Sequence, residues 1–202
     1  MFARQDERDD AYFYELPRFE THIDDDTISA ITAAYSEYLS AQSVILDLMS
    51  SWISHLPEQM PFAHVAGLGM NEQELQKNPR LDEYVVHDLN QQPELPYPDD
   101  RFDAVLIAVS VQYLIRPMSV FSSVARVLKP GGICMVCMSH RIFPEKVIRA
   151  FQVLPPAQRC ELVASYFNHS GNFEQVEILD RSPQHADPLW IVMARKFSCL
   201  IT

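Results

Sequence analysis

The fold is decided by residues 95–132, which read LPYPDDRFDAVLIAVSVQYLIRPMSVFSSVARVLKPGG. The run at 102–110 is apolar almost throughout and has the length of a buried strand. After a turn at Arg116-Pro117, apolar side chains recur at helical spacing as far as Leu128. Gly131-Gly132 then allows a tight turn into a second apolar run, ICMVCMS at 133–139. A strand, a helix and a strand in this order predict a parallel βαβ unit.

The same alternation of strands and helices extends to both sides of this unit. Further strands are expected at 44–48, 62–70, 84–88, 173–180 and 188–196. Residues 181–187 are too few for a helical crossover, so one of the last two strands is expected to run antiparallel. The near-continuous apolar strands predict an α/β fold in which helices cover both faces of a mostly parallel sheet.

Helices are expected where capping residues precede apolar positions at helical spacing. The expected helices begin after Asp24 to Asp26, run from Ser50-Ser51 to near Pro57, cover 71–78, follow Pro144 and cover about 157–168.

Composition excludes several classes of function. The chain has 202 residues, which suits one domain, and carries 16 basic against 27 acidic residues for a net charge of -11. Such a surface repels phosphate backbones, so we expect a small-molecule partner and no nucleic acid. No run approaches the roughly 18 apolar residues of a membrane span, and no apolar segment follows the charged start MFARQDERDD. We therefore expect a cytoplasmic protein without a membrane partner, and the sequence leaves the oligomeric state open.

The cysteines are interpreted as buried thiols. Cys134-x-x-Cys137 invites a redox or zinc site, but a separation of three puts the two side chains on opposite faces of a strand. The sequence shows no export signal, so Cys134, Cys137, Cys160 and Cys199 are expected to be reduced thiols and not disulfides. His55 and His64 show no ligand spacing with cysteines or carboxylates, so no metal is expected.

Parts of residues 95–132 resemble a known family. Leu95-Pro96, Asp99 and Phe102-Asp103 match the lead into strand four of class I S-adenosylmethionine-dependent methyltransferases of the type 11-like group. Arg126 to Gly132 matches the helix end before their fifth strand, and the resemblance extends over about residues 40–197. It implies a Rossmann-like, doubly wound, seven-stranded sheet within a domain at 44–202, and an N-terminal helical arm or lid at 1–43. It also implies S-adenosylmethionine as the cofactor and methyl transfer to a small molecule.

The cofactor loop departs from the family pattern. Where the family has D-x-G-x-G-x-G, this chain has Asp47-Leu48-Met49-Ser50-Ser51-Trp52-Ile53. Side chains at the glycine positions resist positive φ and close ligand approach, and a β-branched Ile53 resists most. Gly69 stands where the family carries the acid that holds the ribose, with Asn71 as a weaker neutral substitute. Asp88 matches the remaining acid, which in relatives approaches the adenine amino group.

Two explanations of these departures stay open. One is a rebuilt site, in which Ser50 and Ser51 cap a helix whose start holds the cofactor carboxylate. The other is a non-catalytic, methyltransferase-like binding or regulatory protein that has lost the cofactor. A nucleotide-dependent oxidoreductase is disfavoured because no G-x-G-x-x-G follows a strand. The residues assigned to the cofactor are Asp47, Met49, Ser50, Ser51, Gly69, Met70, Asn71, Asp88, Leu89 and Ser110.

Methyl transfer depends largely on positioning, so a catalytic side chain is needed only where the acceptor must lose a proton. His140 lies just past the expected strand at 133–139 and is the candidate general base. The candidate substrate-binding residues are Tyr14, His55, Gln112, Tyr113 and Arg141.

Overall fold

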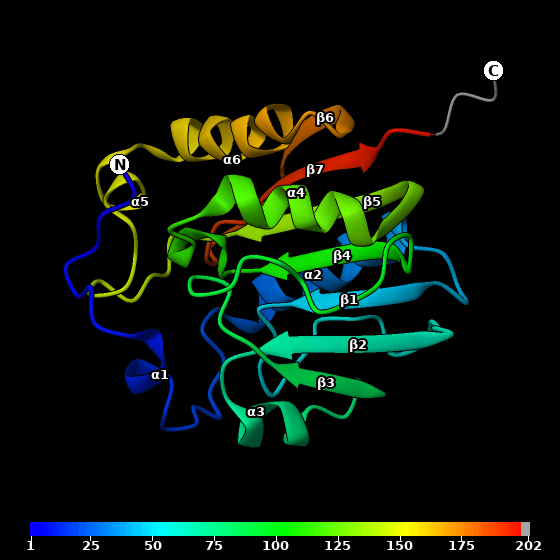
Figure 1. Cartoon of the computed structure of the whole chain (residues 1–202), viewed down its shortest axis with the longest axis horizontal. Coiled ribbons are helices and arrows are strands. Elements are labelled where there is room, and N and C mark those ends of the chain that lie inside the picture. The colour runs from blue at the N-terminus through cyan, green and yellow to red at the C-terminus, as the bar shows by residue number, and fades with distance from the viewer. Residues whose placement is uncertain (199–202) are drawn as a thin grey trace.

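A seven-stranded sheet forms the centre of the protein, whose computed structural model describes residues 1–198 (Figure 1). The strands are β1 (Val44–Leu48), β2 (His64–Gly69), β3 (Glu83–Val86), β4 (Phe102–Ala108), β5 (Leu128–Met138), β6 (Phe173–Asp180) and β7 (Trp190–Lys196). They lie in the order β3-β2-β1-β4-β5-β7-β6. β7 runs antiparallel to β5 and β6, and the other pairs are parallel. The predicted Rossmann-like fold with an antiparallel C-terminal strand is confirmed.

Helices cover both faces of this sheet (Figure 1). They are α1 (Asp10–Phe13), α2 (Asp25–Tyr38), α3 (Glu72–Lys77), α4 (Pro117–Val127), α5 (Arg149–Val153) and α6 (Pro156–Ser170), with a 3-10 turn η1 (Val111–Tyr113). In β1, Leu46 and Leu48 pack into the core that α4 and α6 cover, whereas Ile45 packs into the core under α2. Because both faces are buried, the strands read as continuous apolar runs.

Cys134 and Cys137 lie on opposite faces of β5, one in each of these two cores. Burial raises the pKa of the Cys137 thiol to about 12. Cys160 is also a buried free thiol, and Cys199 lies outside the described residues. The interpretation of the Cys-x-x-Cys pair as core residues is confirmed.

Local capping signals account for several helix ends. Asp24 accepts a hydrogen bond from the Thr27 amide at 2.8 Å, so it caps α2 as predicted. Asn71 caps α3 in the same way through the Glu74 amide, at 3.1 Å. Gly171, with a φ of 69°, ends α6 in the left-handed conformation that glycine adopts at low cost.

The helix expected from Ser50 to Pro57 does not form. The Ser50 amide donates to the Leu68 carbonyl at 2.8 Å, and the hydroxyls of Ser50 and Ser54 donate to the Asp47 carboxylate. These bonds tie the segment to the ends of β1 and β2, in competition with the hydrogen bonds of a helical turn. The expected anion site at a helix start is therefore wrong.

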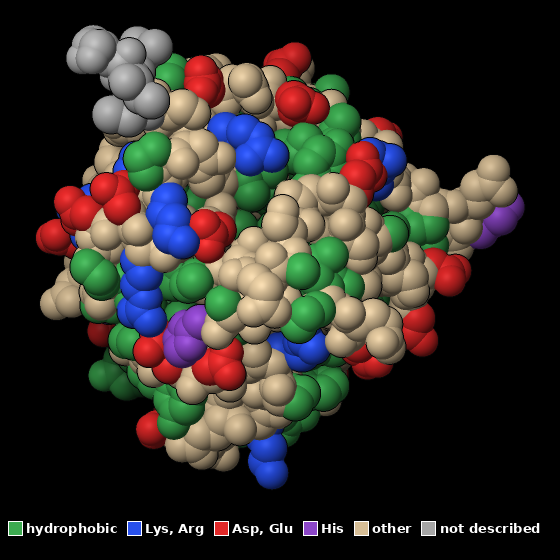
Figure 2. Space-filling model, turned by 90° about the vertical axis from the view of Figure 1, so that its right-hand side faces the viewer, with side chains coloured by type: hydrophobic (Ala, Val, Ile, Leu, Met, Phe, Trp, Pro, Cys, Tyr) green, Lys and Arg blue, Asp and Glu red, His purple; other side chains and the backbone are tan. Residues whose placement is uncertain are grey.

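The two ends of the strands differ in their surroundings. The parallel strands end at the left of Figure 1, where the N-terminal arm, defined here as residues 1–23, runs past them. Figure 2 shows the other end, where acidic and basic side chains are interspersed. Ion pairs there link neighbouring strand starts, for example Lys129 with Asp103 at 2.8 Å. Within residues 1–198 no helix combines the length and apolar character that a membrane crossing needs.

Candidate functional site

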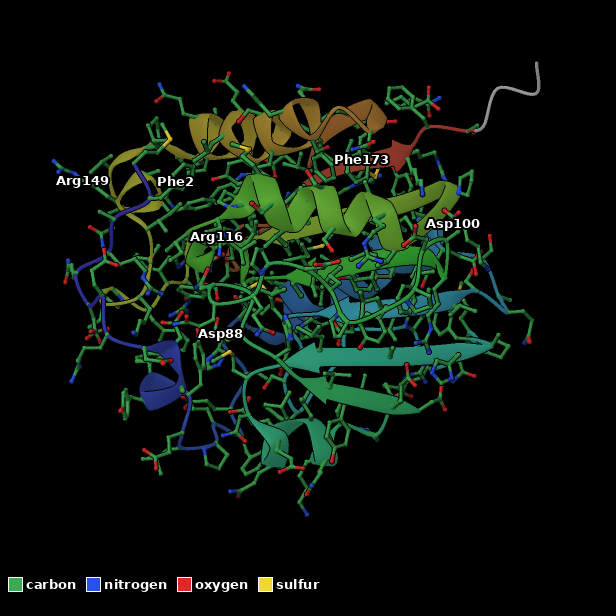
Figure 3. The ribbon with its side chains drawn as sticks, viewed as in Figure 1. Phe2, Asp88, Asp100, Arg116, Arg149 and Phe173 are labelled. Atoms are coloured by element: carbon green, nitrogen blue, oxygen red, sulfur yellow. The ribbon has the colours of Figure 1, made fainter. Side chains whose placement is uncertain are left out.

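A cavity of about 160 Å³ lies between the carboxyl ends of the parallel strands and the N-terminal arm. It lies beside β1 and β4, which are neighbours in the sheet but not in the sequence. Ligands of open α/β sheets bind at this switch point of the strand order. Figure 3 shows Asp88 at this end of the sheet and Asp100 at the opposite end.

Most of the predicted site residues line this one cavity. Every residue predicted to bind the cofactor lines the cavity: Asp47, Met49, Ser50, Ser51, Gly69, Met70, Asn71, Asp88, Leu89 and Ser110. Of the predicted substrate contacts, Tyr14, His55 and Tyr113 also line it.

The predicted base and two predicted substrate residues lie elsewhere. His140 and Arg141 both face Asp187, at 3.3 Å from His140 Nε2 and 2.9 Å from Arg141 Nε. Gln112 is buried and donates to the Val109 and Arg141 carbonyls. The chain after β5 turns toward the loop before β7, which takes His140 and Arg141 away from the cavity, and Gln112 does not line it either.

The first glycine position of the cofactor loop keeps a glycine-like backbone. Met49 has a φ of 61°, in the left-handed region that costs a residue with a Cβ about 1–2 kcal/mol. Ser51 and Ile53 are outside that region, so the conflict expected at Ile53 does not arise. Of the three family glycine positions, one therefore has a positive φ in this chain and the other two do not.

The space beside Gly69 is filled by the loop that follows β1. The Ser50 carbonyl oxygen lies where a Cβ on Gly69 would be placed. This close approach of two backbones requires glycine at position 69 and excludes a carboxylate there.

Asp47 is buried at the end of β1 and accepts hydrogen bonds from the Ser50 and Ser54 hydroxyls. Burial raises the pKa of Asp47 to about 6, and the two hydroxyls partly oppose this shift. The carboxyl group therefore ionises just below neutral pH.

Polar side chains that follow β2 hold the N-terminal arm. Asn71 Nδ2 donates to the Tyr14 carbonyl at 2.8 Å. Glu74 accepts the Arg18 amide at 2.7 Å on Oε1 and the Ser51 hydroxyl at 2.6 Å on Oε2. Glu74 is 8% exposed and lines the cavity. A carboxylate is thus present at this end of β2, five positions after Gly69.

Asp88 follows β3, which ends at Val86. Its Oδ1 accepts the amides of Asn90 at 2.8 Å and Gln91 at 3.3 Å. Its Oδ2 accepts no hydrogen bond from residues 1–198. Burial raises the pKa of Asp88, although the two amides lower it. One oxygen of this carboxylate is therefore free to accept a hydrogen bond from a ligand.

The end of β4 is strained and aromatic. Val109 has a φ of 49°, a genuine outlier for a β-branched residue. Tyr113, which follows it, stacks on Phe143 with ring centroids 5.7 Å apart and accepts the Phe143 amide at 2.9 Å. Met49 is strained at the neighbouring strand end, so two residues of the cavity wall have positive φ angles.

Three buried polar atoms of the lining residues have no hydrogen-bond partner within the described part of the chain: His55 Nδ1, Ser110 Oγ and Arg18 Nη1. Buried polar atoms of native proteins are nearly always paired, so these three atoms are available to pair with a polar ligand. Burial lowers the pKa of His55 to about 4, which keeps its imidazole neutral at pH 7.

Acidic side chains outnumber basic ones in the cavity wall. The wall has the guanidinium of Arg18 and the carboxyl groups of Asp10, Glu20, Asp47, Glu74 and Asp88. This excess of negative charge favours a ligand with positive charge.

A buried ionic cluster anchors the arm beside the cavity. Asp10 accepts hydrogen bonds from Arg4 at 2.7 Å and from Asn90 at 2.7 Å, and pairs with Lys146 at 2.9 Å. Asp10 and Lys146 are 4% and 1% exposed. Burial raises the pKa of Asp10, but these partners together bring it below its ordinary value. The cluster joins the arm to the loop after β3 and to the segment before α5.

Sequence analysis missed Arg18, Asp10 and Glu74. The first two belong to the arm, whose sequence has no periodicity that would place it over the strand ends. Glu74 did carry a signal, because it stands three residues after the capping Asn71, where a capping-box glutamate turns back toward the helix start.

Comparisons with known proteins agree with this geometry. The model of the methyltransferase domain family matches residues 31–136. The demethylmenaquinone methyltransferase of Halalkalibacterium halodurans is 38% identical over 84 residues, which are 39% of this chain and 34% of that protein. The match therefore spans about a third of this curated relative.

Solved structures share the fold. The crystal structure of the [4+2]-cyclase SpnF has a TM-score of 0.62 and 17% identity, over 83% of this chain and 81% of that one. An S-adenosylmethionine-dependent methyltransferase from Mesorhizobium loti has a TM-score of 0.56 and 19% identity, over 83% and 98%.

The strand order and the cavity at its switch point define the class I S-adenosylmethionine-dependent methyltransferase fold, which confirms the resemblance in the sequence. The family model covers more than half of the chain. The chain belongs to the methyltransferase domain family.

Proposed function

We propose that this chain is an S-adenosylmethionine-dependent methyltransferase that acts on a small molecule. One observation carries the proposal: the predicted cofactor residues and three unpartnered polar atoms line a single cavity at the switch point of the sheet.

The residues present fit the separate parts of this cofactor. Asp88 Oδ2 is free to accept the adenine amino group. The backbone of Met49 to Ser51 lies at the end of β1, where the methionine part would be held, and the acidic wall suits its sulfonium and ammonium charges. Arg18 Nη1 would bind the carboxylate through a charge-assisted hydrogen bond.

When bound, the cofactor supplies an electrophilic methyl group, and the chain supplies position and exclusion of water. Tyr14, Tyr113 and Phe143 form an aromatic part of the wall. No general base is assigned, because His140 lies outside the cavity and a pKa of about 4 makes His55 a weak base at pH 7.

We propose an aromatic acceptor. Stacking on rings such as Tyr113 and Phe143 stabilises a planar ligand by about 0.5–1.5 kcal/mol. The relative with 38% identity over 84 residues is named a demethylmenaquinone methyltransferase, which agrees with an aromatic acceptor.

The arm moves when the cofactor enters. The cavity of about 160 Å³ is smaller than the roughly 300–1,000 Å³ of most ligand pockets. Tyr14, Arg18 and His22 of the arm form part of its wall, so an outward shift of these residues makes the required room.

A non-catalytic, methyltransferase-like binding protein is the second candidate. It is favoured by the Ser50 carbonyl oxygen, which fills the place of the ribose-binding acid, and by the arm, which engages Asn71.

Titration calorimetry with S-adenosylmethionine and S-adenosylhomocysteine, and thermal unfolding in parallel, distinguishes the two. A ligand at 100 times its Kd stabilises a protein by about 2.7 kcal/mol. We expect binding that Asp88→Asn weakens and that Asp100→Asn, at the opposite end of the sheet, leaves unchanged. If neither ligand binds at millimolar concentration, the methyltransferase proposal fails and the binding protein remains.

A further inference from the structure

A buried carboxylate stands near the place where the ribose acid of the family is missing. Position 69 cannot carry that acid, because the Ser50 carbonyl oxygen fills the space of its Cβ. Glu74, in the first turn of α3, lines the same cavity and is 8% exposed. A carboxylate has therefore been lost at the strand end and is present one helical turn further along the chain.

The sheet order places Glu74 between the two ends of the proposed cofactor site. Asp88 follows β3 and the Met49–Ser51 loop follows β1, whereas α3 follows β2, which lies between those strands. In a sulfonium nucleoside the ribose joins the adenine to the methionine part. An acid that follows the middle strand is thus placed for the ribose.

Three hydrogen bonds fix the Glu74 side chain and the start of its helix. Asn71 caps the Glu74 amide at 3.1 Å, Arg18 donates its amide to Oε1 at 2.7 Å, and Ser51 donates its hydroxyl to Oε2 at 2.6 Å. Each carboxylate oxygen has two lone pairs, so each can accept one further donor. Two such acceptors on one rigid group match the two vicinal hydroxyls of a ribose.

The other carboxyl groups of the wall near Glu74 have other partners or are exposed. Asp10 is paired with Arg4 and Lys146, and Asp47 is held by Ser50 and Ser54. Glu20 is exposed, in the arm. Among the carboxyl groups of the wall, only that of Glu74 is both buried and on the segment that directly follows β2.

We infer that Glu74 has taken over ribose binding and accepts hydrogen bonds from the 2′- and 3′-hydroxyls of a nucleoside ligand. The inference rests on the proposed function, because it requires that the cavity binds S-adenosylmethionine. It also joins the arm to the ligand, since the same carboxylate holds the Arg18 amide.

Titration calorimetry with S-adenosylhomocysteine and its 2′-deoxy analogue tests the inference. For the wild type, we expect the analogue to bind at least tenfold more weakly, because hydrogen bonds to a charged group contribute more than neutral ones. Glu74→Gln is expected to weaken the binding of S-adenosylhomocysteine by at least a similar factor, and to weaken the binding of the analogue, which keeps only the 3′-hydroxyl, by a clearly smaller factor. Glu72→Gln, on the exposed side of α3, is the matched control and should leave both affinities unchanged.

Each possible result of the calorimetry leads to one conclusion about Glu74. If Glu74→Gln weakens the binding of both ligands by the same factor, Glu74 only holds the arm and the loop, and the inference is overturned. It is also overturned if wild-type protein binds the 2′-deoxy analogue as tightly as S-adenosylhomocysteine, a measurement that does not depend on whether the variant folds. If the wild type binds neither ligand, the proposed function fails as well, which separates that failure from the first two.

Discussion

Ser50 and Gly69 are in direct backbone contact: the Ser50 carbonyl oxygen occupies the place where a Cβ on residue 69 would be built. The Ser50 amide also bonds to the carbonyl of Leu68, the preceding residue of β2, at 2.8 Å. The family glycines lost after β1 and the family acid lost after β2 are therefore linked. A loop that packs onto the end of β2 makes a side chain at position 69 impossible.

Gly69→Ala is expected to lower the free energy of unfolding by about 3 kcal/mol, at the upper end of overpacking effects, since the added Cβ meets backbone that cannot move aside. Gly67→Ala is the control, because its Cβ meets the flexible end of the Leu81 side chain and should cost about 1 kcal/mol. Urea unfolding of both variants measures the difference. Equal losses would show that the Ser50 loop yields readily.

Met49 provides a test of backbone strain. At its φ of 61°, glycine is more favourable than a residue with a Cβ, so Met49→Gly should be more stable than Met49→Ala by about 1 kcal/mol. Met70, which also lines the cavity but has no positive φ, should show the ordinary order, with alanine the more stable. Urea unfolding of the four variants checks this reversal, and the same order at both positions would contradict it.

The fold was predictable because its signals are local and repeated. The apolar runs around Phe102 and Cys134, the helix between them and the short link before β7 determine layers and strand direction. The strand assignments also predict which residues lie at the carboxyl edge of the sheet, where Asp47, Asp88 and Ser110 line the cavity.

The geometry of the site was less predictable because it depends on contacts between distant segments. The Ser50 loop packs on β2 instead of forming a helix, which no local propensity indicates. Arg18 belongs to the arm, and its place at the cavity depends on long-range contacts such as those of the arm with Asn71 and Glu74. His140 lies at the expected strand end, but Asp187 from a distant loop draws it away from the cavity.

Asp10→Asn should lower the free energy of unfolding at pH 7 by about 3 kcal/mol, because it leaves Lys146 buried without its full charge partner. The pKa of Asp10 lies below its ordinary value in the folded state. Its contribution is therefore present above about pH 4 and is lost as the pH falls below that value. Urea unfolding at pH 7 and pH 3 checks this, with the exposed Glu58→Gln as the neutralising control. A difference that is as large at pH 3 as at pH 7 would contradict the charge argument.

Asp47 should have the opposite pH dependence. Its pKa is 3.8 in an unfolded chain and about 6 in the fold, where burial disfavours the charge. Between these values the folded state holds a proton that the unfolded state has released, so the contribution of Asp47 to stability falls as the pH rises from about 4 to about 6.

Asp47→Asn removes this titration. At pH 8 the variant should be more stable than the wild type by up to about 3 kcal/mol, whereas at pH 4 the two should be nearly equal. The same variant should bind S-adenosylmethionine more weakly, because the cavity loses a negative charge that faces a cationic ligand.

Urea unfolding across this pH range and calorimetry at pH 8 measure the two effects. If Asp47→Asn is less stable at pH 8, the hydroxyls of Ser50 and Ser54 stabilise the carboxylate by more than burial costs it. Gained stability together with lost affinity would show that this buried charge is kept for binding.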